Sequence, residues 1–296
     1  MERMAGMTTG ELAMRVLNQQ RAALRERAAG IRADEEAEDV HRMRVATRRL
    51  RAALRLFEDV LPPSAEAVSI DLRWLAERLG AVRDLDVQLQ HARRRGEALS
   101  MLDDLTPYVA WLAARRQHAR AALLQALDDQ RYTSLLVDLQ GLAAGEPSRA
   151  SADVVTDAPP RLRKAWKQLR KVAEPLGPGS AEHDLHRARI RAKRVRYAAE
   201  FHVDVYGDAA REFAERVTRL QDALGEHQDG VVTRGLVAEA RQSAAEAWSP
   251  AASFALGRLV QADAARAEEL RAQAACLWDR LQRRDWKSFR RALRSA

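Results

Sequence analysis

The sequence predicts an all-α protein built from two similar helical halves, and three observations support this. Ala, Arg, Leu and Glu dominate the 296 residues, whereas β-branched and aromatic residues are scarce. Apolar residues recur at the i, i+3, i+4 and i+7 spacing of amphipathic helices. A basic segment that opens at His41 returns at His186, 145 residues later. We therefore predict one domain, residues 1–296, made of two pseudo-symmetric bundles that arose by internal tandem duplication, with halves 1–145 and 146–296.

The first half contains signals for five helices. Thr8 or Thr9 is a suitable N-cap for a first helix that runs to about Ile31. The acidic residues 34–39 precede the basic segment, and negative charge in a first turn favours helix initiation. Pro62-Pro63 must end the basic helix. Further helices are expected over residues 65–95, 107–128 and 131–142.

A linker and a second set of helices are expected to follow. Residues 141–160 contain Gly-Glu-Pro-Ser and Asp-Ala-Pro-Pro, which predict a linker. Gly207-Asp208 is a helix-ending signal at the position of the earlier proline pair. Arg131–Leu135 resembles Asp285–Phe289, 154 positions later, so about nine residues are expected as an insertion in the later helices. The expected elements are helices 160–174, 181–206, 208–241 and 251–284, then a terminal segment with Trp286 and Phe289.

Each basic segment separates into two faces when it is placed on a helix. In the first copy the core face consists of Met43, Leu50, Leu54, Phe57 and Leu61, and the opposite face carries Arg44, Arg48, Arg51 and Arg55 beneath His41. The second copy repeats this row with His186, Arg189, Lys193 and Arg196. We therefore expect two rows of cations, each with an imidazole at its N-terminal end.

The 145-residue offset continues beyond the basic segments. The matching positions are Leu75, Leu79, Gly80, Asp84 and Val87 with Leu220, Leu224, Gly225, Asp229 and Val232. The second copy departs from the first at Glu200 and Gln228, where the first half has Arg55 and Arg83. We therefore expect the first half to bind more of an anionic ligand's charge.

The net charge of +8 favours a polyanionic partner: a nucleic acid, polyphosphate or an anionic membrane surface. The single Cys276 excludes an intrachain disulfide and a four-thiolate metal site, which suits a reducing cytoplasm. The first ten residues lack the apolar region of an export signal, and no apolar stretch approaches a membrane span. We expect a soluble, cytoplasmic protein.

The shared features of the two copies resemble those of a known family. In each, a His opens a helix, Arg follows three residues later, two basic residues precede an aliphatic residue and Arg, and Leu-Gly and Asp occur downstream. This pattern resembles the CHAD family, the conserved histidine α-helical domains, over nearly the whole chain. The resemblance implies two four-helix bundles related by a pseudo-twofold axis, inorganic polyphosphate bound on the basic surface between them, and an association with polyphosphate granules.

The residue types suit that ligand. Polyphosphate carries about one negative charge per internal unit and no bases to read, so a row of forked guanidinium donors is an appropriate surface. An imidazole at the end of the row can donate to a phosphate oxygen. We predict a basic trough that binds polyphosphate, and other polyanions less specifically, through His41, Arg42, Arg44, Arg48, Arg49, Arg51, Arg55, His186, Arg187, Arg189, Lys193, Arg194 and Arg196.

Other interpretations remain open. An arginine row is often only solvated surface, and the basic charge also fits a nucleic-acid-binding protein or a granule scaffold. Asp84 and Asp229 have the surroundings of guanidinium-orienting residues more than of catalytic ones. His183 and His186 have a spacing compatible with a metal, but the first half lacks a counterpart of His183. No nucleotide-binding or hydrolase motif is present, so we expect a binding protein without catalysis, metal or cofactor.

Overall fold

The computed structural model describes residues 6–33, 37–145, 152–243 and 248–295, and within these residues all regular elements are helices. Their only β-type feature is an isolated antiparallel bridge between Thr8 and Asp153. This confirms the prediction of an all-α protein.

The first half forms five helices close to the expected bounds. Thr8 and Glu11 make a capping box at the start of the first helix: the Glu11 N–H donates to Thr8 Oγ1 at 3.2 Å, and the Thr8 N–H donates to Glu11 Oε2 at 2.7 Å. The basic helix ends at Leu56, before Pro62-Pro63. The elements are α1 (Thr9–Ala33), α2 (Ala37–Leu56), α3 (Ala65–Ala98), α4 (Thr106–Asp128) and α5 (Gln130–Ala144).

The second half follows the same order with two differences. The expected basic helix 181–206 breaks at His202, and Gly207, with φ of 56°, then turns the chain into the next helix. The helix that corresponds to α4, Pro250–Arg280, has 31 residues where α4 has 23, and it continues into the last helix through a π-helical turn. The elements are α6 (Val154–Ala173), α7 (Glu182–Phe201), α8 (Val203–Tyr206), α9 (Asp208–Ser243), α10 (Pro250–Arg280), η2 (Leu281–Asp285) and α11 (Trp286–Ser295).

The predicted linker 141–160 is too long at both ends. Helix α5 extends to Ala144 and α6 begins at Val154, so Pro159 and Pro160 lie inside α6. Because Pro159 has no N–H to donate to the Val155 carbonyl, that oxygen is left for another donor, and the Tyr206 hydroxyl donates to it at 2.9 Å. Residues 146–151 of the predicted linker, and 34–36 of the acidic segment, lie outside the described residues.

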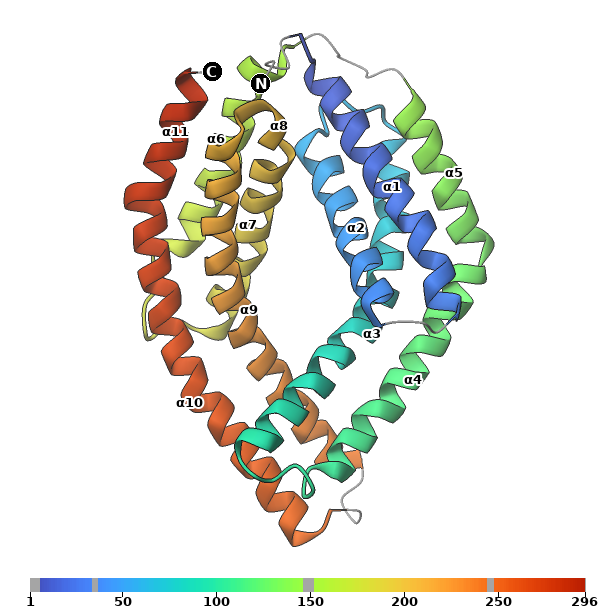
Figure 1. The fold of residues 1–296 in the computed structure, drawn as a ribbon, viewed down its shortest axis with the longest axis vertical. Helices are drawn as coiled ribbons and strands as arrows, with labels where there is room; N and C mark the ends of the chain where they lie inside the picture. Colours follow the sequence, from blue (N-terminus) through green and yellow to red (C-terminus); the bar gives the residue numbers. More distant parts are fainter. Residues whose placement is uncertain (1–5, 34–36, 146–151, 244–247, 296) are drawn as a thin grey trace.

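Three apolar cores hold the helices together. One fills the first half and also takes in Tyr197 and Phe201 from α7. A second fills the other half, where Trp166 stacks on Trp286 with ring centroids 4.7 Å apart. The third is shared by α3, α4, α9 and α10, near the crossing of α3 and α9 that Figure 1 shows below α2 and α7. The two halves are therefore packed together both above and below the space that α2 and α7 flank.

Positions 145 residues apart touch each other where the halves meet. Thr8 and Asp153 form the isolated antiparallel bridge, in which the Thr9 N–H donates to the Ala152 carbonyl and the Val154 N–H donates to the Met7 carbonyl, both at 3.0 Å. At the other end of the molecule, the Thr233 hydroxyl donates to Gln88 Oε1 at 2.8 Å. Between these ends the rings of Phe57 and His202 lie 6.1 Å apart. Several positions 145 residues apart in the sequence thus lie close together between the two halves.

Candidate functional site

The apolar face expected for α2 is buried in the first core. Met43, Leu50 and Phe57 have no exposed surface, and Leu54 and Leu61 are each 5% exposed. In α7 the corresponding face consists of small residues, and Ala188, Ala192 and Val195 are buried. With these faces packed against α1, α3, α6 and α9, the cationic faces of the two helices are left for other contacts.

Five cations from the two helices form what we call the central cationic cluster: Arg44 and Arg48 from α2, and Arg189, Lys193 and Arg196 from α7. Burial, and then the charges of the four arginines, lower the pKa of Lys193 to about 7. The pKa of Arg48 is lowered in the same way, by burial first and by Arg44 and Arg196 next. The cations of α2 and α7 therefore face one another across the two halves.

Carboxylates neutralise only part of this cluster. Arg44 Nη2 donates to Asp84 Oδ1 at 3.0 Å, and Arg196 Nε lies 3.3 Å from Glu200 Oε1. No ion pair to Arg48, Arg189 or Lys193 is found within the described part of the chain. The Nε atoms of Arg48 and Arg189 are buried donors without a hydrogen-bond partner there. Such donors favour an anionic acceptor.

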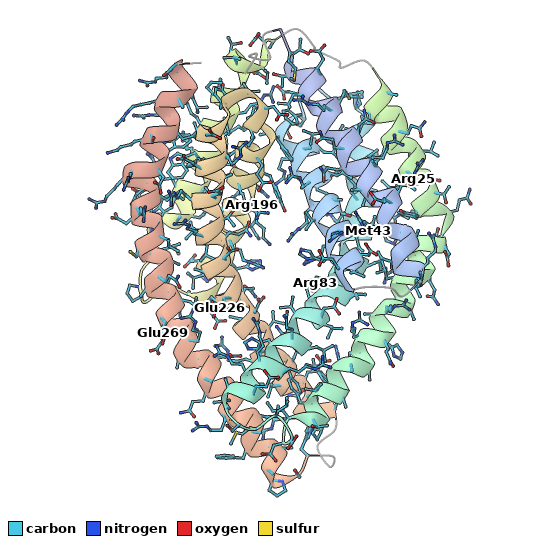
Figure 2. All side chains as sticks on the ribbon, viewed as in Figure 1. Arg25, Met43, Arg83, Arg196, Glu226 and Glu269 are labelled. Atoms are coloured by element: carbon cyan, nitrogen blue, oxygen red, sulfur yellow. The ribbon has the colours of Figure 1, made fainter. Side chains whose placement is uncertain are left out.

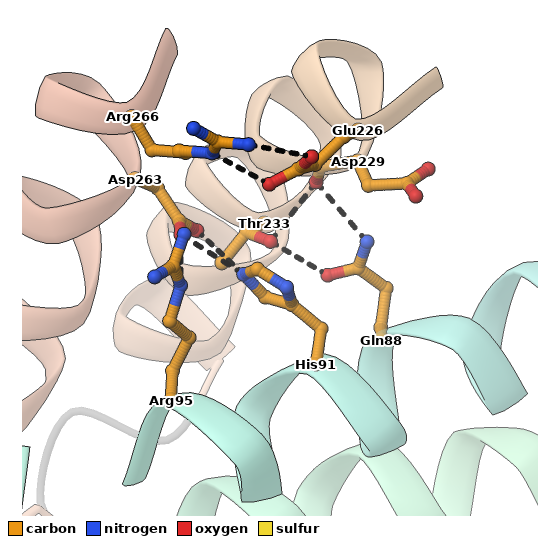
Figure 3. Close-up of polar contacts among 8 residues, drawn as sticks. All are labelled: Gln88, His91, Arg95, Glu226, Asp229, Thr233, Asp263 and Arg266. Carbon is orange, nitrogen blue, oxygen red and sulfur yellow. Dashed lines mark hydrogen bonds and ion pairs between the residues drawn. The ribbon is translucent and has the colours of Figure 1, made fainter. Parts of the chain in front are cut away.

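Asp229 is a third carboxylate near the cluster. Burial raises the pKa of Asp229, although Arg189 acts in the opposite direction. Its backbone carbonyl accepts hydrogen bonds from Gln88 Nε2 at 3.1 Å and from the Thr233 hydroxyl at 3.0 Å, which fixes α9 against α3 (Figure 3). Asp84 and Asp229 thus lie beside arginines, in the surroundings expected for orienting residues.

The two motif histidines lie at the edge of the cluster in different surroundings. Burial, and then the charge of Arg83, lower the pKa of the half-buried His41. His186 is exposed, and its Nδ1 lies 2.9 Å from Gln228 Oε1. Figure 2 labels Arg83 on α3 and Arg196 on α7, on the two sides of the interior that the bundles flank. The sequence identifies Arg83 only as the counterpart of Gln228, because the effect of its charge on His41 depends on how α2 packs on α3.

The remaining predicted residues lie outside the central cluster. Arg42 donates to Glu38 at 2.9 Å, and Arg187 lies 3.9 Å from Asp184, both on exposed surface. Arg49 forms an ion pair with Glu200 and lies over the Phe201 ring, 5.3 Å from its centroid. The other three, Arg51, Arg55 and Arg194, are close to one another or to further arginines. Each predicted row is therefore divided between different surroundings.

A polar network at the crossing of α3, α9 and α10 was not predicted. His91 Nε2 lies 2.8 Å from Asp263 Oδ2, and Arg95 Nε donates to Asp263 Oδ1 at 3.2 Å (Figure 3). Asp263 is 3% exposed, so the His91 ring and the Arg95 guanidinium compensate a buried carboxylate. No local pattern in the sequence predicts a partner for His91, because Asp263 lies 172 positions away and shares no motif with it.

The histidine pair considered for a metal is not directed at a common point. His183 Nε2 lies 3.0 Å from Asp184 Oδ1, and His186 is directed to Gln228. Among the described residues, no three His, Cys, Asp or Glu side chains gather as metal ligands. None of the described helices is long and apolar enough to cross a membrane.

These features define a class of all-helical proteins in which two basic helices, one from each half, face each other. The chain belongs to the CHAD family, since the CHAD domain model matches residues 15–238. It is 33% identical over 245 residues to the uncharacterized protein Rv2226 of Mycobacterium tuberculosis. That match covers 79% of the chain and 46% of the relative, so the chain spans about half the length of the curated relatives it matches.

Two solved structures share the fold. The crystal structure of the CHAD domain from the plant Ricinus communis has a TM-score of 0.73 and 28% identity, and the match covers 98% of this chain and 93% of that one. PptA from Streptomyces chartreusis has a TM-score of 0.74 and 22% identity, with 92% and 99% covered. The second likeness concerns the fold alone.

Proposed function

We propose that the chain binds inorganic polyphosphate at the central cationic cluster. The observation that carries this proposal is the convergence of cations from α2 and α7, three of which have no ion-pair partner among the described residues. Membership of the CHAD family supports it, because the resemblance implies this ligand. Polyphosphate would place its oxygens near Arg48 and Arg189, whose buried Nε donors have no hydrogen-bond partner among the residues that the structure describes.

The two halves would act together on one polymer. Contacts between positions 145 residues apart are those expected of two copies related by a twofold axis, and they support an origin by tandem duplication. A flexible polyanion lying along this axis would meet Arg48 from one copy and Lys193 from the other, which are also 145 positions apart. Binding would release counterions and weaken steeply with salt.

The chain would act as a binding protein, not as an enzyme. Catalysis of phosphoryl transfer generally requires carboxylates that hold a metal ion at the transferred group. Asp84 is instead paired with Arg44, and Asp229 lies beside Arg189. We place the protein with its ligand in the cytoplasm and at polyphosphate granules. Long-chain polyphosphate with Mg²⁺ and purified protein should release no phosphate above a control without protein.

Charge reversal on one face of the two helices tests the site. The double variant R48E/R189E should lower affinity for long-chain polyphosphate at least about a hundredfold near 0.1 M salt, because several phosphate contacts are lost. The matched control R42E/R187E changes the net charge equally, at exposed positions of the same two helices. It should leave affinity within about threefold. Equal losses in both variants would assign binding to overall charge and contradict this site.

The second candidate is general nucleic-acid binding, which the net charge of +8 favours. Sequence-specific DNA recognition requires polar side chains that reach base edges, and the cluster contains Arg and Lys alone. Competition distinguishes the two functions. If double-stranded DNA displaces polyphosphate at equal charge concentration, the site is a generic polyanion surface.

A scaffold role at granules is compatible with polyphosphate binding and would require additional protein partners.

A further inference from the structure

The positive charge of the chain is concentrated on two helices that take no part in the central cationic cluster. Residues 146–296 contain 28 Lys and Arg against 21 Asp and Glu, whereas residues 1–145 contain 22 against 21. Helix α6 has six basic residues against one acidic residue, and η2 together with α11 has the same numbers. The corresponding helices α1 and α5 together have six against three. The excess charge of the second half therefore lies on α6 and α11.

The use of lysine also sets these two helices apart. The chain contains five lysines, and Lys164, Lys167, Lys171 and Lys287 are on α6 and α11. A general bias of the sequence towards Arg does not place its few lysines on one side of the molecule. The basic character of α6 and α11 is therefore a feature of this surface and not of the overall composition.

Aromatic packing holds α6 and α11 together on the outer side of the second half (Figure 1). Trp166 of α6 stacks on Trp286 of α11 with ring centroids 4.7 Å apart, and Phe289 of α11 stacks on Phe213 of α9 at 4.6 Å. The apolar side of each helix is buried by these contacts. The basic residues are left on the surface.

Six exposed cations flank the Trp166–Trp286 stack, and we call them the outer basic face. At 100° per residue, each lies within about 100° of the tryptophan of its own helix. They are Arg163, Lys167 and Arg170 on α6, and Lys287, Arg290 and Arg294 on α11. Within the described residues none of the six forms an ion pair, and Asp157, the acidic residue of α6, is paired with Arg161 at 2.7 Å. Their charge is available to a partner.

We infer that the outer basic face binds the sugar–phosphate backbone of a nucleic-acid duplex, without regard to base sequence. A duplex has a high density of negative charge, and exposed Arg and Lys bind it by releasing its counterions. Helix α6 has 20 residues and is therefore roughly 30 Å long, close to the ~34 Å of one duplex turn. The two helices together offer a row of cations of suitable length.

Other partners fit this face less well. The centre of a protein interface is apolar, and a helix that inserts into a membrane surface exposes apolar side chains. The large apolar residues that are exposed in the described part of the chain lie on other elements: Ile70, Leu102, Val137, Ile190 and Phe254. A single strand would stack its bases on exposed aromatic rings, but Trp166, Trp286 and Phe289 are all buried. These observations favour a duplex.

Charge reversal on the outer basic face tests the inference. K167E/R290E/R294E should lower affinity for a 20-bp DNA duplex at least about tenfold near 0.1 M salt, measured by fluorescence anisotropy. The slope of log affinity against log salt should decrease by about three, one for each lost phosphate contact. The control R25E/R78E/R94E changes the net charge equally at exposed arginines of the first half and should stay within about threefold of wild type. Equal losses in both variants, or full affinity in the first, would overturn the inference.

Two further variants separate this face from folding and from the central cationic cluster. K167Q/R290Q/R294Q removes charge without reversing it, and it should lose duplex affinity in the same direction while its helix content and Tm match wild type. Full affinity in this variant would contradict the site. R48E/R189E should bind the duplex within about threefold of wild type. A loss as large as that of K167E/R290E/R294E would instead place the duplex at the central cationic cluster.

The inference does not rest on polyphosphate binding, because the two sites share no residue. If wild type binds no polyphosphate, the proposed function fails while the duplex titrations still decide this inference. If both sites are correct, wild type held on an immobilised duplex should retain labelled polyphosphate added at one chain per protein, and R48E/R189E should not. Release of wild type from the duplex by that amount of polyphosphate would contradict separate sites.

Three probes identify the partner. DNA duplexes of two different sequences should bind within about twofold of each other, because backbone contacts carry no sequence information. A duplex RNA of the same length is the second source of this backbone, and a loss in K167E/R290E/R294E with either duplex supports the face and shows which one it binds. Vesicles with 30% phosphatidylglycerol report a membrane surface. Vesicle binding that K167E/R290E/R294E abolishes, with duplex binding unchanged, would overturn the inference.

Discussion

Helices α2 and α7 have the same place in their respective halves, yet they present different charges. Arg48 on α2 corresponds to Lys193 on α7, and Arg55 corresponds to Glu200. The charge of Arg83 lowers the pKa of His41, whereas the matching His186 is hydrogen-bonded to the neutral Gln228. The comparison teaches that the repeated apolar pattern sets where a helix lies, and that single polar substitutions then decide what that helix can bind.

The difference also makes the two helices respond differently to pH. A guanidinium such as Arg48 keeps its charge in neutral solution even when burial lowers its pKa. The amine of Lys193 has a pKa near 7 and is only partly charged there. At neutral pH the pair Arg189 and Lys193 on α7 therefore carries less positive charge than the pair Arg44 and Arg48 on α2.

Reversing charge on one helix at a time should give the largest effect. We expect R44E/R48E to weaken polyphosphate binding roughly tenfold more than R189E/K193E at pH 7.5, because the α7 pair starts with less charge. The measurement is a titration with polyphosphate of defined length at one salt concentration. At pH 6 the gap should narrow, since Lys193 is then protonated. A larger loss of polyphosphate affinity in R189E/K193E would contradict the expectation that the first half binds more of the ligand's charge.

Replacing Lys193 with arginine should make the two helices more alike. Bound polyphosphate favours the protonated amine. It should therefore raise the pKa of Lys193 above the value of about 7 that this residue has in the protein without ligand. Binding therefore takes up a proton above pH 7, and wild-type affinity should fall as pH rises through this range. K193R stays charged and should bind with an affinity that changes less than about twofold between pH 7 and pH 9.

Calorimetry in two buffers of different ionisation enthalpy measures this proton uptake directly. The wild-type heat should differ between the buffers near pH 7.5, and the K193R heat should not. R42K, at an exposed position of α2 outside the cluster, provides the matched control. If wild type and K193R take up the same number of protons on binding, a group other than Lys193 is the one that becomes protonated.

The helix order was largely predictable from sequence, because it depends on local patterns. Apolar spacing and the Thr8 cap indicated α1, and buried Met43, Leu50 and Phe57 confirmed the face of α2. The start of α6 was missed, because the Tyr206 hydroxyl, which donates to the Val155 carbonyl that Pro159 leaves without a donor, comes from a different helix. Pro159 and Pro160 were interpreted as part of a linker, because proline usually ends a helix. In the structure the contact with Tyr206 allows α6 to continue through them.

The candidate site was less predictable, because it depends on contacts between distant residues. The helical wheel identified the arginines of α2 but not their different partners. Arg44 is paired with Asp84, and Arg51 is beside Arg73. Pairing of His91 with Asp263 required the crossing of α3, α9 and α10, which no repeat or motif encodes. The periodicity of the sequence predicts the face of the helix on which a side chain lies. The residue that this side chain contacts depends on the tertiary fold.

The starts of α1 and α6 allow a smaller test of the comparison between halves. Asp153 accepts a hydrogen bond from the Val155 N–H at 2.8 Å, and Thr8 accepts one from the Glu11 N–H at 3.2 Å. Replacing either cap with alanine should lower the free energy of unfolding by about 1 kcal/mol, with the larger loss for the shorter bond of Asp153. Chemical denaturation measures both, and S249A, at the cap of α10, is the matched control for a cap away from the junction. A larger loss of unfolding free energy in T8A than in D153A would contradict the expectation that the Asp153 cap contributes more.

The smallest effect concerns the histidine pair. Burial is the first cause of the lowered pKa of His41, and the charge of Arg83 is the second. R83Q gives α3 the residue that α9 has at the corresponding position, so it should raise the midpoint of His41 titration while leaving it below the value of a free histidine. NMR of the imidazole Cε1–H resonance against pH measures this midpoint, with the assignment from H41N. The sign follows from removing a cation, which makes the protonated ring less unfavourable. If the midpoint is unchanged, burial alone sets the difference, and Arg83 has no part in distinguishing the two histidines.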